Sequence, residues 1–404
     1  MSPPSSISGK EFTLLMALLM SVVAISIDAL LPALGILGSE LGVMHPNQVQ
    51  LVIGCIFGGM AVGQLIAGPL SDAMGRKPIL YAGIALYLAG SIFCYFSNTF
   101  GLLLVGRCLQ GLGVSGPYVT AISVVRDKFS GRNMAEVMSL VMMIFILVPA
   151  IAPSLGQAVM HLAGWRAIFL MYVGYSIAIG LWIAFRLEET LPVAHRVPLK
   201  LKAFVHGLRV VTGNRTTMLY TLCMGLSFGS FIGYLGASQQ IFQNQFGVGE
   251  AFSLYFGGLA LVLGVASLAN SRFVARLGMR FICLRAIATI TLASAAFLAL
   301  HWIMPVTLPM FVGYAAVLFF AFGLMFGNLN AIAMEPMGDV AGMASAIIGS
   351  SSSVLSLILG SVIGQFYNGT LIPITLGFLV LGGLSWTVIS AEHRWHARTL
   401  AAAK

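Results

Sequence analysis

Two charged side chains lie inside long apolar stretches of the sequence, and their types could do chemistry there. Of twelve Asp and Glu residues, Asp28 alone falls deep within an apolar run, and Arg107 is the one clear base in such a position. A carboxyl group can take up and release a proton, whereas a guanidinium keeps its charge. The pair is therefore suited to moving a proton, with Asp28 as the carrier and Arg107 stabilising its ionised form.

The cost of burying these charges predicts that they are neighbours. An unpaired charge at the centre of an apolar helix costs about 2.5–3.5 kcal/mol on insertion scales, so each side chain should face the protein interior and find a partner. Counting residues along the two runs places Asp28 and Arg107 near one depth. We therefore predict a proton-coupling pair. A static ion pair that only fixes the packing is the alternative.

The elements that carry these residues are membrane-spanning helices. The chain has 404 residues, of which 59% are apolar and 8% charged, against roughly 25% charged in soluble domains. About 20 apolar residues span a bilayer, so the fold class predicted is an all-α membrane protein of twelve helices. The expected spans are 12–37, 48–70, 78–97, 100–124, 134–160, 165–187, 216–243, 250–275, 280–301, 307–332, 341–365 and 371–391.

The distribution of basic residues predicts the topology. With the N-terminus in the cytoplasm, the odd-numbered connections hold only Arg166, and reversing the chain would put nearly every base on the wrong side. Both termini are therefore expected to be cytoplasmic. The even-numbered connections hold Arg76, Lys77, Arg126, Lys128, Arg132, Arg196, Lys200, Lys202, Arg209, Arg272, Arg276 and Arg280.

The sequence also predicts two halves. A polar, basic stretch separates six spans from six, which gives an N-terminal bundle over 1–187, a cytoplasmic linker over 188–215 and a C-terminal bundle over 216–404. The segments 68–77 and 271–280, which follow spans two and eight, carry a glycine and a terminal base at matching offsets. A repeated six-helix unit accounts for this echo, and such repeats place a substrate near the membrane midplane between them.

Several classes of function are disfavoured by what the sequence contains. The formal charge of +9 is scattered between apolar runs and forms no basic module, so no nucleic-acid partner is expected. The five cysteines lie singly and the seven histidines form no cluster, so we expect no metal and no cofactor. A phosphate-binding loop and a nucleophile elbow are also missing, which argues against ATP-driven transport by this chain and against an enzyme.

The connection after span two carries a specific motif. Gly68-Pro-Leu-Ser-Asp72-Ala-Met-Gly75-Arg76-Lys77 resembles the cytoplasmic loop signature G-x-x-x-D-[RK]-x-G-[RK]-[RK] of the major facilitator superfamily, with Ala73 in place of the usual base. Asp72 can accept hydrogen bonds from Arg76. The resemblance implies a gating role for Gly68, Asp72, Gly75, Arg76 and Lys77, and a generic basic turn is the alternative.

Two further motifs in the first half fit the same superfamily. Arg107-Cys-Leu-Gln110-Gly111-Leu-Gly113 in span four is similar to its R-x-x-Q-G-x-G motif. The segment 149–156 in span five, with Pro149, Pro153 and Gly156, resembles the G-P-x-x-G motif of its antiporter branches, although Ala152 stands where glycine is usual. The two prolines are expected to bend or loosen span five, because each removes a backbone hydrogen bond.

The sequence of span one resembles one particular branch of this superfamily. Ser26-Ile-Asp28-Ala-Leu-Leu-Pro32-Ala-Leu looks like the S-I-D-x-x-L-P-A-L signature of the Bcr/CflA-like multidrug resistance exporters. The likeness implies a proton-coupled antiporter of the bacterial inner membrane that exports small lipophilic, neutral or weakly cationic compounds by alternating access. Its partners would be substrate, protons and membrane lipid, and each chain is expected to act as a monomer.

The residues expected to line the substrate cavity follow by analogy with that fold. The analogy selects faces of spans one, four, seven and ten, and a core with one acid and one base disfavours strongly acidic cargo. Each candidate could instead be a packing residue, and two asparagines two positions apart cannot share a helix face. The candidates are Gln110, Tyr118, Met142, Phe231, Tyr234, Gln239, Asn328 and Asn330.

Two other functions remain compatible with these features. A secondary exporter of a physiological metabolite, sugar or siderophore would share every motif described above. A membrane receptor that does not transport would not require Asp28 to gain and lose a proton. The sequence does not distinguish the substrate.

Overall fold

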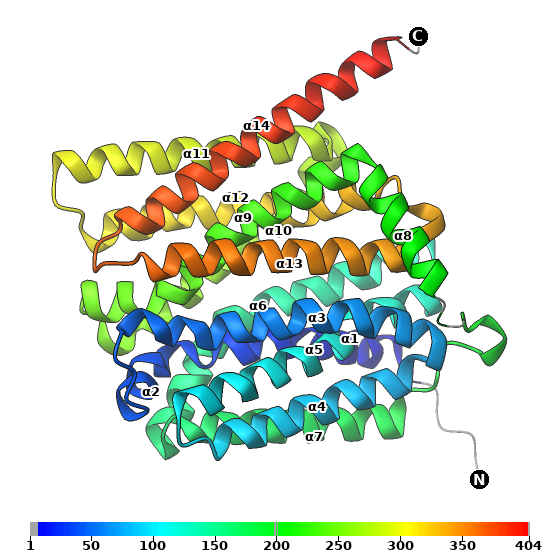
Figure 1. The fold of residues 1–404 in the computed structure, drawn as a ribbon, viewed down its shortest axis with the longest axis horizontal. Helices are drawn as coiled ribbons and strands as arrows, with labels where there is room; N and C mark the ends of the chain where they lie inside the picture. Colours follow the sequence, from blue (N-terminus) through cyan, green and yellow to red (C-terminus); the bar gives the residue numbers. More distant parts are fainter. Residues whose placement is uncertain (1–6, 198, 200, 403–404) are drawn as a thin grey trace. The chain divides into compact units, whose positions relative to one another are not determined.

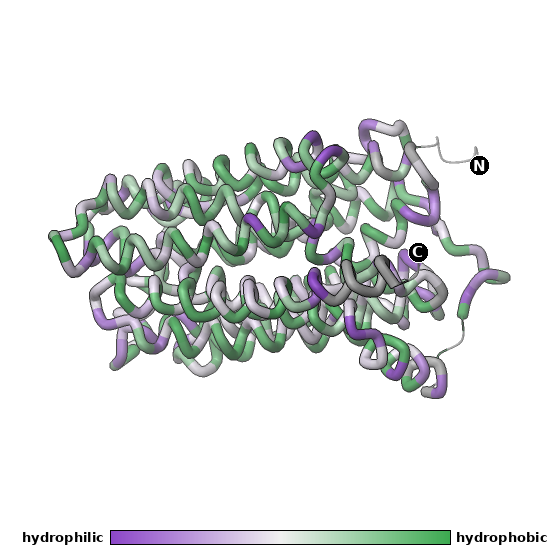
Figure 2. The backbone as a smooth tube through the Cα atoms, turned by 90° about the horizontal axis from the view of Figure 1, so that it is seen from above, coloured by the Kyte–Doolittle hydropathy of each residue, from purple (hydrophilic) through white to green (hydrophobic). Residues whose placement is uncertain are grey.

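The computed structural model describes residues 7–197, 199 and 201–402, and the regular elements in that part of the chain are helices. Lys200, one of the bases used for the topology, and the side chain of Arg132 lie outside it. Within the described residues, twelve helices are long and apolar enough to cross a membrane. Hydrophobic residues run along the helices and hydrophilic residues gather mostly near their ends (Figure 2). The predicted fold class is confirmed.

The chain divides into two compact units, Met1–Ala203 and Phe204–Lys404, and the division falls within the predicted linker 188–215. Unit 1 contains six membrane-spanning segments, drawn from blue to green in Figure 1. Its helices are α1 (Gly9–Asp28), a 3₁₀ turn (Leu31–Ala33), α2 (Leu34–Glu40), a 3₁₀ turn (Pro46–Gln50), α3 (Leu51–Met74), α4 (Arg76–Tyr95), α5 (Phe100–Lys128), α6 (Gly131–Ala163), α7 (Arg166–Arg186) and a 3₁₀ turn (Val193–His195).

Unit 2 contains the other six spans and most of one additional helix, α8, which begins three residues before the unit boundary and is too short to cross a membrane. Its first span ends in a π-helical stretch, a local widening of the helix that is rare in proteins. Its elements are α8 (Leu201–Gly213), α9 (Arg215–Gln239), the π-helix (Gln240–Gln245), a 3₁₀ turn (Gly249–Ala251), α10 (Phe252–Leu277), α11 (Met279–Ile303), α12 (Leu308–Met334), a 3₁₀ turn (Gly338–Val340), α13 (Ala341–Gln365) and α14 (Ile372–Ala402).

The two echoing segments have the same backbone geometry in both units. Gly75 joins α3 to α4 with φ 105°, and Gly278 joins α10 to α11 with φ 79°. Positive φ values of this size are accessible mainly to glycine, because a Cβ would clash with the backbone. One glycine therefore ends one span and begins the next in each unit, which explains why glycine recurs at the matching offset.

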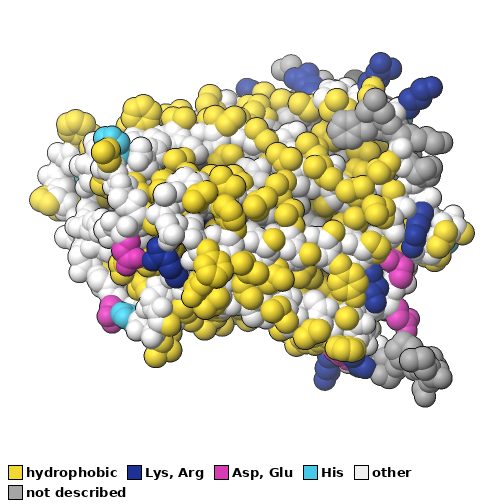
Figure 3. Space-filling model, turned by 60° about the horizontal axis from the view of Figure 1, so that its bottom comes forward, with side chains coloured by type: hydrophobic (Ala, Val, Ile, Leu, Met, Phe, Trp, Pro, Cys, Tyr) yellow, Lys and Arg dark blue, Asp and Glu magenta, His cyan; other side chains and the backbone are white. Residues whose placement is uncertain are grey.

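The surface carries many apolar side chains, as expected for a protein surrounded by lipid. Large hydrophobic residues are exposed on helices of both units, for example Val62, Ile66, Val265 and Leu292. The face seen in Figure 3 is covered mainly by hydrophobic side chains, with charged ones near its ends. An apolar surface of this extent suits a hydrocarbon solvent and not water.

Candidate functional site

The first span is interrupted at the residue predicted to carry the proton. Helix α1 ends at Asp28, and Pro32 in the following 3₁₀ turn has no N–H to donate to the Asp28 carbonyl. The interruption leaves the Ser26 carbonyl oxygen available to other donors. Arg107 Nη2 donates to it at 2.9 Å and the Tyr172 hydroxyl at 3.2 Å. Side chains thus satisfy backbone groups that a continuous helix would pair internally.

Arg107 is fully buried and bound to uncharged acceptors. Besides the Ser26 carbonyl, its Nε donates to the Val52 carbonyl at 3.0 Å, and its Nη1 donates to Gln110 Oε1 at 2.9 Å. These contacts tie α5 to α1 and α3. Arg107 therefore acts in this conformation as a cap for the broken first span.

The direct ion pair expected between Asp28 and Arg107 is absent from this conformation. Asp28 is buried, with 6% of its surface exposed. Among the residues that the structure describes, none donates a hydrogen bond to its carboxyl group or forms an ion pair with it. Arg107 lies close by in the chain fold, because it binds the carbonyl two residues before Asp28. The proton-coupling role of the two residues stays a prediction.

A buried polar network continues from Arg107 through the interior of unit 1. Gln110 donates from Nε2 to Ser91 Oγ at 2.8 Å, and Ser91 donates to the Tyr87 carbonyl at 2.8 Å. The Tyr87 hydroxyl in turn contacts Ser26 Oγ. Gln110, predicted to contact substrate, is fully buried and committed to this network.

The glycines of the motif in α5 permit close helix packing. A Cβ on Gly111 would clash with the Ile56 carbonyl of α3, and a Cβ on Gly113 would clash with the Tyr87 backbone N of α4. Without side chains at these positions, α5 contacts two neighbours at backbone distance, as small residues allow in membrane proteins. The motif therefore supplies Arg107, and its glycines let α5 pack closely enough to position that side chain.

The predicted antiporter motif packs directly against the break in the first span. A Cβ on Gly156 of α6 would clash with the carbonyl oxygen of Ala29, the residue after Asp28. Helix α6 runs through both Pro149 and Pro153 without interruption, so the prolines do not end it. The motif therefore lies beside the candidate proton site, a contact that the sequence did not predict.

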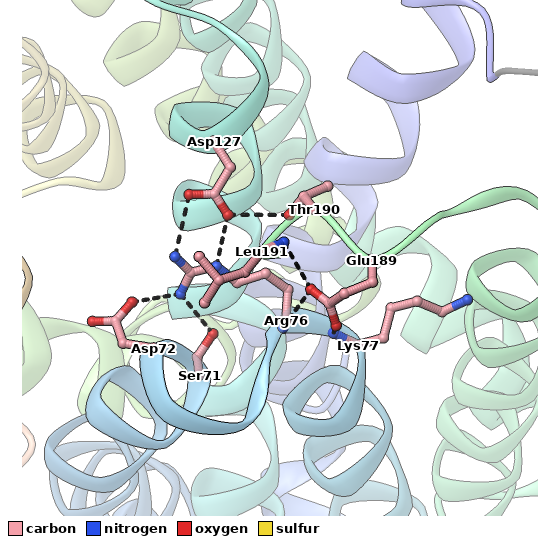
Figure 4. A network of polar contacts seen from close by, with 8 residues as sticks. All are labelled: Ser71, Asp72, Arg76, Lys77, Asp127, Glu189, Thr190 and Leu191. Carbon is pink, nitrogen blue, oxygen red and sulfur yellow. Dashed lines mark hydrogen bonds and ion pairs between the residues drawn. The ribbon is translucent and has the colours of Figure 1, made fainter. Parts of the chain in front are cut away.

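A charged cluster at one end of unit 1 contains the loop motif (Figure 4). Arg76, 3% exposed, donates from Nη1 to Asp72 Oδ1 at 2.6 Å and to Ser71 Oγ at 3.0 Å. Its Nε and Nη2 donate to the two oxygens of Asp127, at 2.7 and 3.2 Å. The expected hydrogen bond from Arg76 to Asp72 is present without a base at position 73. Asp127, which the sequence did not single out, is the second acid of the cluster.

Glu189 closes the same cluster from the segment after α7. Its carboxyl group accepts hydrogen bonds from the backbone N–H of Arg76 at 2.9 Å, of Lys77 at 3.1 Å and of Leu191 at 3.0 Å. Burial disfavours ionisation of Glu189, but these N–H groups outweigh it, with help from the charge of Arg196, and lower the pKa of Glu189. The carboxylate caps the N-terminus of α4, where negative charge is favourable.

In unit 2, two of the substrate candidates belong to an aromatic cluster between α9 and α12. Phe231 stacks on Phe228 with ring centroids 5.9 Å apart and packs edge-on against Phe322 at 5.4 Å and Phe326 at 6.0 Å. Phe228, Phe231 and Phe326 are partly exposed. Tyr234 is buried, and its hydroxyl has no hydrogen-bond partner among the described residues.

The other candidates are placed less favourably for binding. Asn328 is buried and donates from Nδ2 to Asn270 Oδ1 of α10 at 2.8 Å, so it joins two helices. Gln239 is buried and donates to Gln243 Oε1 at 2.8 Å at the start of the π-helix. Asn330 is exposed, and Tyr118 and Met142 are partly exposed. Their contact with substrate stays a prediction.

Unit 2 also holds a buried acid that sequence reasoning overlooked. Glu392 of α14 has no exposed surface and accepts hydrogen bonds from Thr216 Oγ1 at 3.2 Å and the Tyr220 hydroxyl at 3.3 Å. Arg280 Nε lies 3.8 Å from its Oε1, and Arg280 Nη1 lies 3.3 Å from Glu335 Oε2. The available signal was an acid one residue past the predicted end of the last span. No group of three or more potential metal ligands occurs in the described chain.

Two six-span units, with ionisable groups buried on the spans and charged clusters at helix ends, are typical of a membrane transporter. The chain belongs to the Major Facilitator Superfamily, whose family model matches residues 16–361. It is 33% identical over 367 residues to the uncharacterized MFS-type transporter YdgK of Bacillus subtilis, covering 88% of this chain and 89% of that protein.

Other relatives and a solved structure agree with this assignment. A bicyclomycin resistance protein homolog of Haemophilus influenzae is 28% identical over 380 residues, covering 92% and 93% of the two chains. The multidrug resistance protein MdtL of Klebsiella pneumoniae is 28% identical over 354 residues, covering 87% and 88%. A crystal structure of a D-xylose-proton symporter has the same fold, with a TM-score of 0.71 at 12% identity over 93% and 96%.

Proposed function

We propose that this chain is a proton-coupled antiporter that exports small lipophilic, neutral or weakly cationic compounds across the bacterial inner membrane by alternating access, with both termini in the cytoplasm. One observation carries the proposal. A buried acid, Asp28, lies at a break in the first span, against which the glycine of the antiporter motif packs. This arrangement supports a role for Asp28 as the proton carrier, because an interrupted helix can change shape at its break.

The environment of Asp28 supports a change of charge during transport. An ionised carboxylate without a partner is costly in an apolar interior, so Asp28 is expected to carry its proton in this conformation. Arg107 binds the nearby Ser26 carbonyl and retains its positive charge. If the first span rearranges at its break, Arg107 can exchange the carbonyl for the Asp28 carboxylate and so favour proton release.

The aromatic cluster supports a lipophilic cargo. The partly exposed rings of Phe228, Phe231 and Phe326 offer stacking faces to a flat apolar molecule and attract a weak cation through their π-systems. The names of the drug-resistance relatives are consistent with such cargo. A metabolite or sugar exporter shares the proton site, and a panel of labelled compounds separates the two.

The test is transport by purified protein in proteoliposomes with an imposed pH gradient. Replacing Asp28 with Asn is expected to reduce proton-driven substrate movement by about tenfold or more, because the amide cannot take up and release a proton. Binding of the same labelled substrate should persist, which shows that the variant is folded. The matched control is Glu136→Gln, which neutralises an exposed acid on α6. Proton-coupled export retained by Asp28→Asn would disprove the proposal.

A further inference from the structure

Helix α8, which follows the first unit's last connection, has one side packed and another exposed. Val211 is buried, and Gly207 lies so close to the start of α13 that an added Cβ would be 2.5 Å from Met343 Cγ. This contact holds α8 near the end of a membrane-spanning helix. In Figure 1, α8 runs steeply beside the end of α13, which itself lies nearly horizontal.

The exposed side of α8 carries two neighbouring stripes of different chemistry. Val205 is 46% exposed and Leu208 is 40% exposed, and their spacing of three places them on one face. Lys202, His206 and Arg209 are exposed on the adjacent face at spacings of four and three. Among the described residues, none forms an ion pair with Lys202 or Arg209. The exposed side of α8 is therefore amphipathic, with an apolar stripe next to a basic stripe.

The position of α8 relative to the membrane follows from the chain itself. It ends at Gly213, and the membrane-spanning helix α9 begins at Arg215, with Asn214 between them capping the N–H of Thr217 at 3.0 Å. A single intervening residue cannot carry α8 away from the membrane surface. Its exposed valine and leucine are therefore close along the chain to the boundary at which a membrane-spanning helix begins.

The positive charge of α8 and its flanking segments indicates the kind of surface that the helix binds. The sequence has no Asp or Glu between Glu189 and Glu250, so α8 and its flanks present only positive charge. A helix of 13 residues is marginal in water without a partner for its apolar side. Interfacial helices with basic and apolar stripes bind anionic lipid by burying the apolar stripe at the acyl boundary and pairing the bases with phosphates.

We propose that α8 is a lipid-sensing element that binds the headgroups of anionic phospholipids, with Val205 and Leu208 inserted below the phosphates and with Lys202 and Arg209 paired to them. The helix is joined to α9 and packed on α13, so the lipid composition of the membrane acts directly on the ends of two spans of unit 2. The inference requires only that the chain spans a membrane and does not depend on the proton site or on the cargo.

Hydrogen exchange of the full-length protein in lipid nanodiscs tests the proposal. Amides of residues 205–213 are expected to exchange about 30-fold more slowly in phosphatidylglycerol-containing discs than in pure phosphatidylcholine, since each of the two bases contributes roughly fivefold. The double variant Lys202→Gln/Arg209→Gln should lose that difference. Leu208→Gln should weaken protection in both lipids, because it removes the apolar contact.

The matched control neutralises two other exposed bases, Arg272 and Arg276 at the end of α10, by substitution with Gln. It should leave exchange in α8 unchanged, and an equal loss in the control would overturn the specific role of α8. Equal protection in both lipids would also overturn it, because another part of the protein would then cover the helix. Protection by inorganic phosphate in detergent would assign the site to a small anion and contradict lipid binding.

Discussion

Arg76 in unit 1 and Arg280 in unit 2 both lie at the start of a span that follows a glycine of positive φ, yet their surroundings differ. Arg76 is 3% exposed, and all three of its guanidinium nitrogens donate hydrogen bonds at 2.6–3.2 Å. Arg280 lies 3.3 Å from Glu335 and 3.8 Å from Glu392, and its Nε makes no hydrogen bond within the described chain. The cluster around Arg76 is therefore held by short, directional hydrogen bonds, whereas the cluster around Arg280 is held by longer contacts.

Arg76 directly follows Gly75, whereas Arg280 lies two residues after Gly278, so the two arginines do not hold the same repeat position. The difference shows how the charged contacts beside a repeated glycine can change in strength. Charge-assisted hydrogen bonds of good geometry are strong and directional, whereas a pair at nearly 4 Å is held mainly by Coulomb attraction. Glu392 therefore depends on the hydroxyls of Thr216 and Tyr220 as much as on Arg280. We infer that disrupting the charged cluster costs more in unit 1 than in unit 2.

The largest expected effect is the loss of the arginine in unit 1. Arg76→Gln leaves Asp127, which is 14% exposed, without its charged partner and should cost about 3 kcal/mol of stability, as for other broken buried pairs. Arg280→Gln should cost less, about 1–2 kcal/mol, because the hydroxyls of Thr216 and Tyr220 still donate to the buried Glu392 when its distant charged partner is removed. Thermal unfolding in detergent measures both. Lys77→Gln is the control, and equal losses for Arg76 and Arg280 would contradict the comparison.

A double-mutant cycle sharpens the comparison without relying on total stability. The coupling between Arg76 and Asp127, measured with Arg76→Gln and Asp127→Asn, should be about 2 kcal/mol, because the two side chains share two hydrogen bonds. The coupling between Arg280 and Glu392, measured with Gln at each position, should be below about 1 kcal/mol. A larger coupling in unit 2 would reverse the assignment of the tight cluster.

Within unit 2, the two acids around Arg280 should behave differently. Glu392→Gln places an NH₂ group among buried donors and should cost about 1–2 kcal/mol through mispaired hydrogen bonds. Glu335 is 53% exposed, so Glu335→Gln should change stability by less than about 0.5 kcal/mol. The midpoints of unfolding compare them directly. A greater loss from Glu335→Gln would show that the exposed acid holds Arg280.

Features that repeat along the sequence were predictable, and features that arise from tertiary contacts were not. Apolar runs predicted the twelve helices, because each helix that crosses a membrane needs about 20 apolar residues in a row. The distribution of bases predicted the topology. Pro32 hinted at a change in the first span, but the placement of the break beside Gly156 depends on how α6 packs. Glu392 looked like an end residue because its burial comes from α9 and α11.

The hydrogen-bond partners of Arg107 were also not predictable from the sequence. A buried charge requires polar contacts, and the sequence predicted the one acid at its depth as the natural choice. Three uncharged acceptors satisfy the guanidinium instead, and one of them exists only because the first span is interrupted. A carbonyl freed by a helix break cannot be recognised from residue types, whereas an acid can.

The smallest expected effect concerns a cap that only unit 1 possesses. Glu189 accepts the N–H groups of Arg76 and Lys77 at the start of α4, while no side chain caps the start of α11 within the described chain. The pKa of Glu189 is lowered from its usual 4.5, so its contribution to stability is present above about pH 4.5 and is lost as the pH falls through the lowered value. Unfolding midpoints of the wild type should therefore fall between pH 5 and pH 3 by slightly more than those of Glu189→Gln. Its exposed neighbour supplies the control, since Glu188→Gln should keep the full pH dependence, and identical curves for all three proteins would show that the cap contributes nothing.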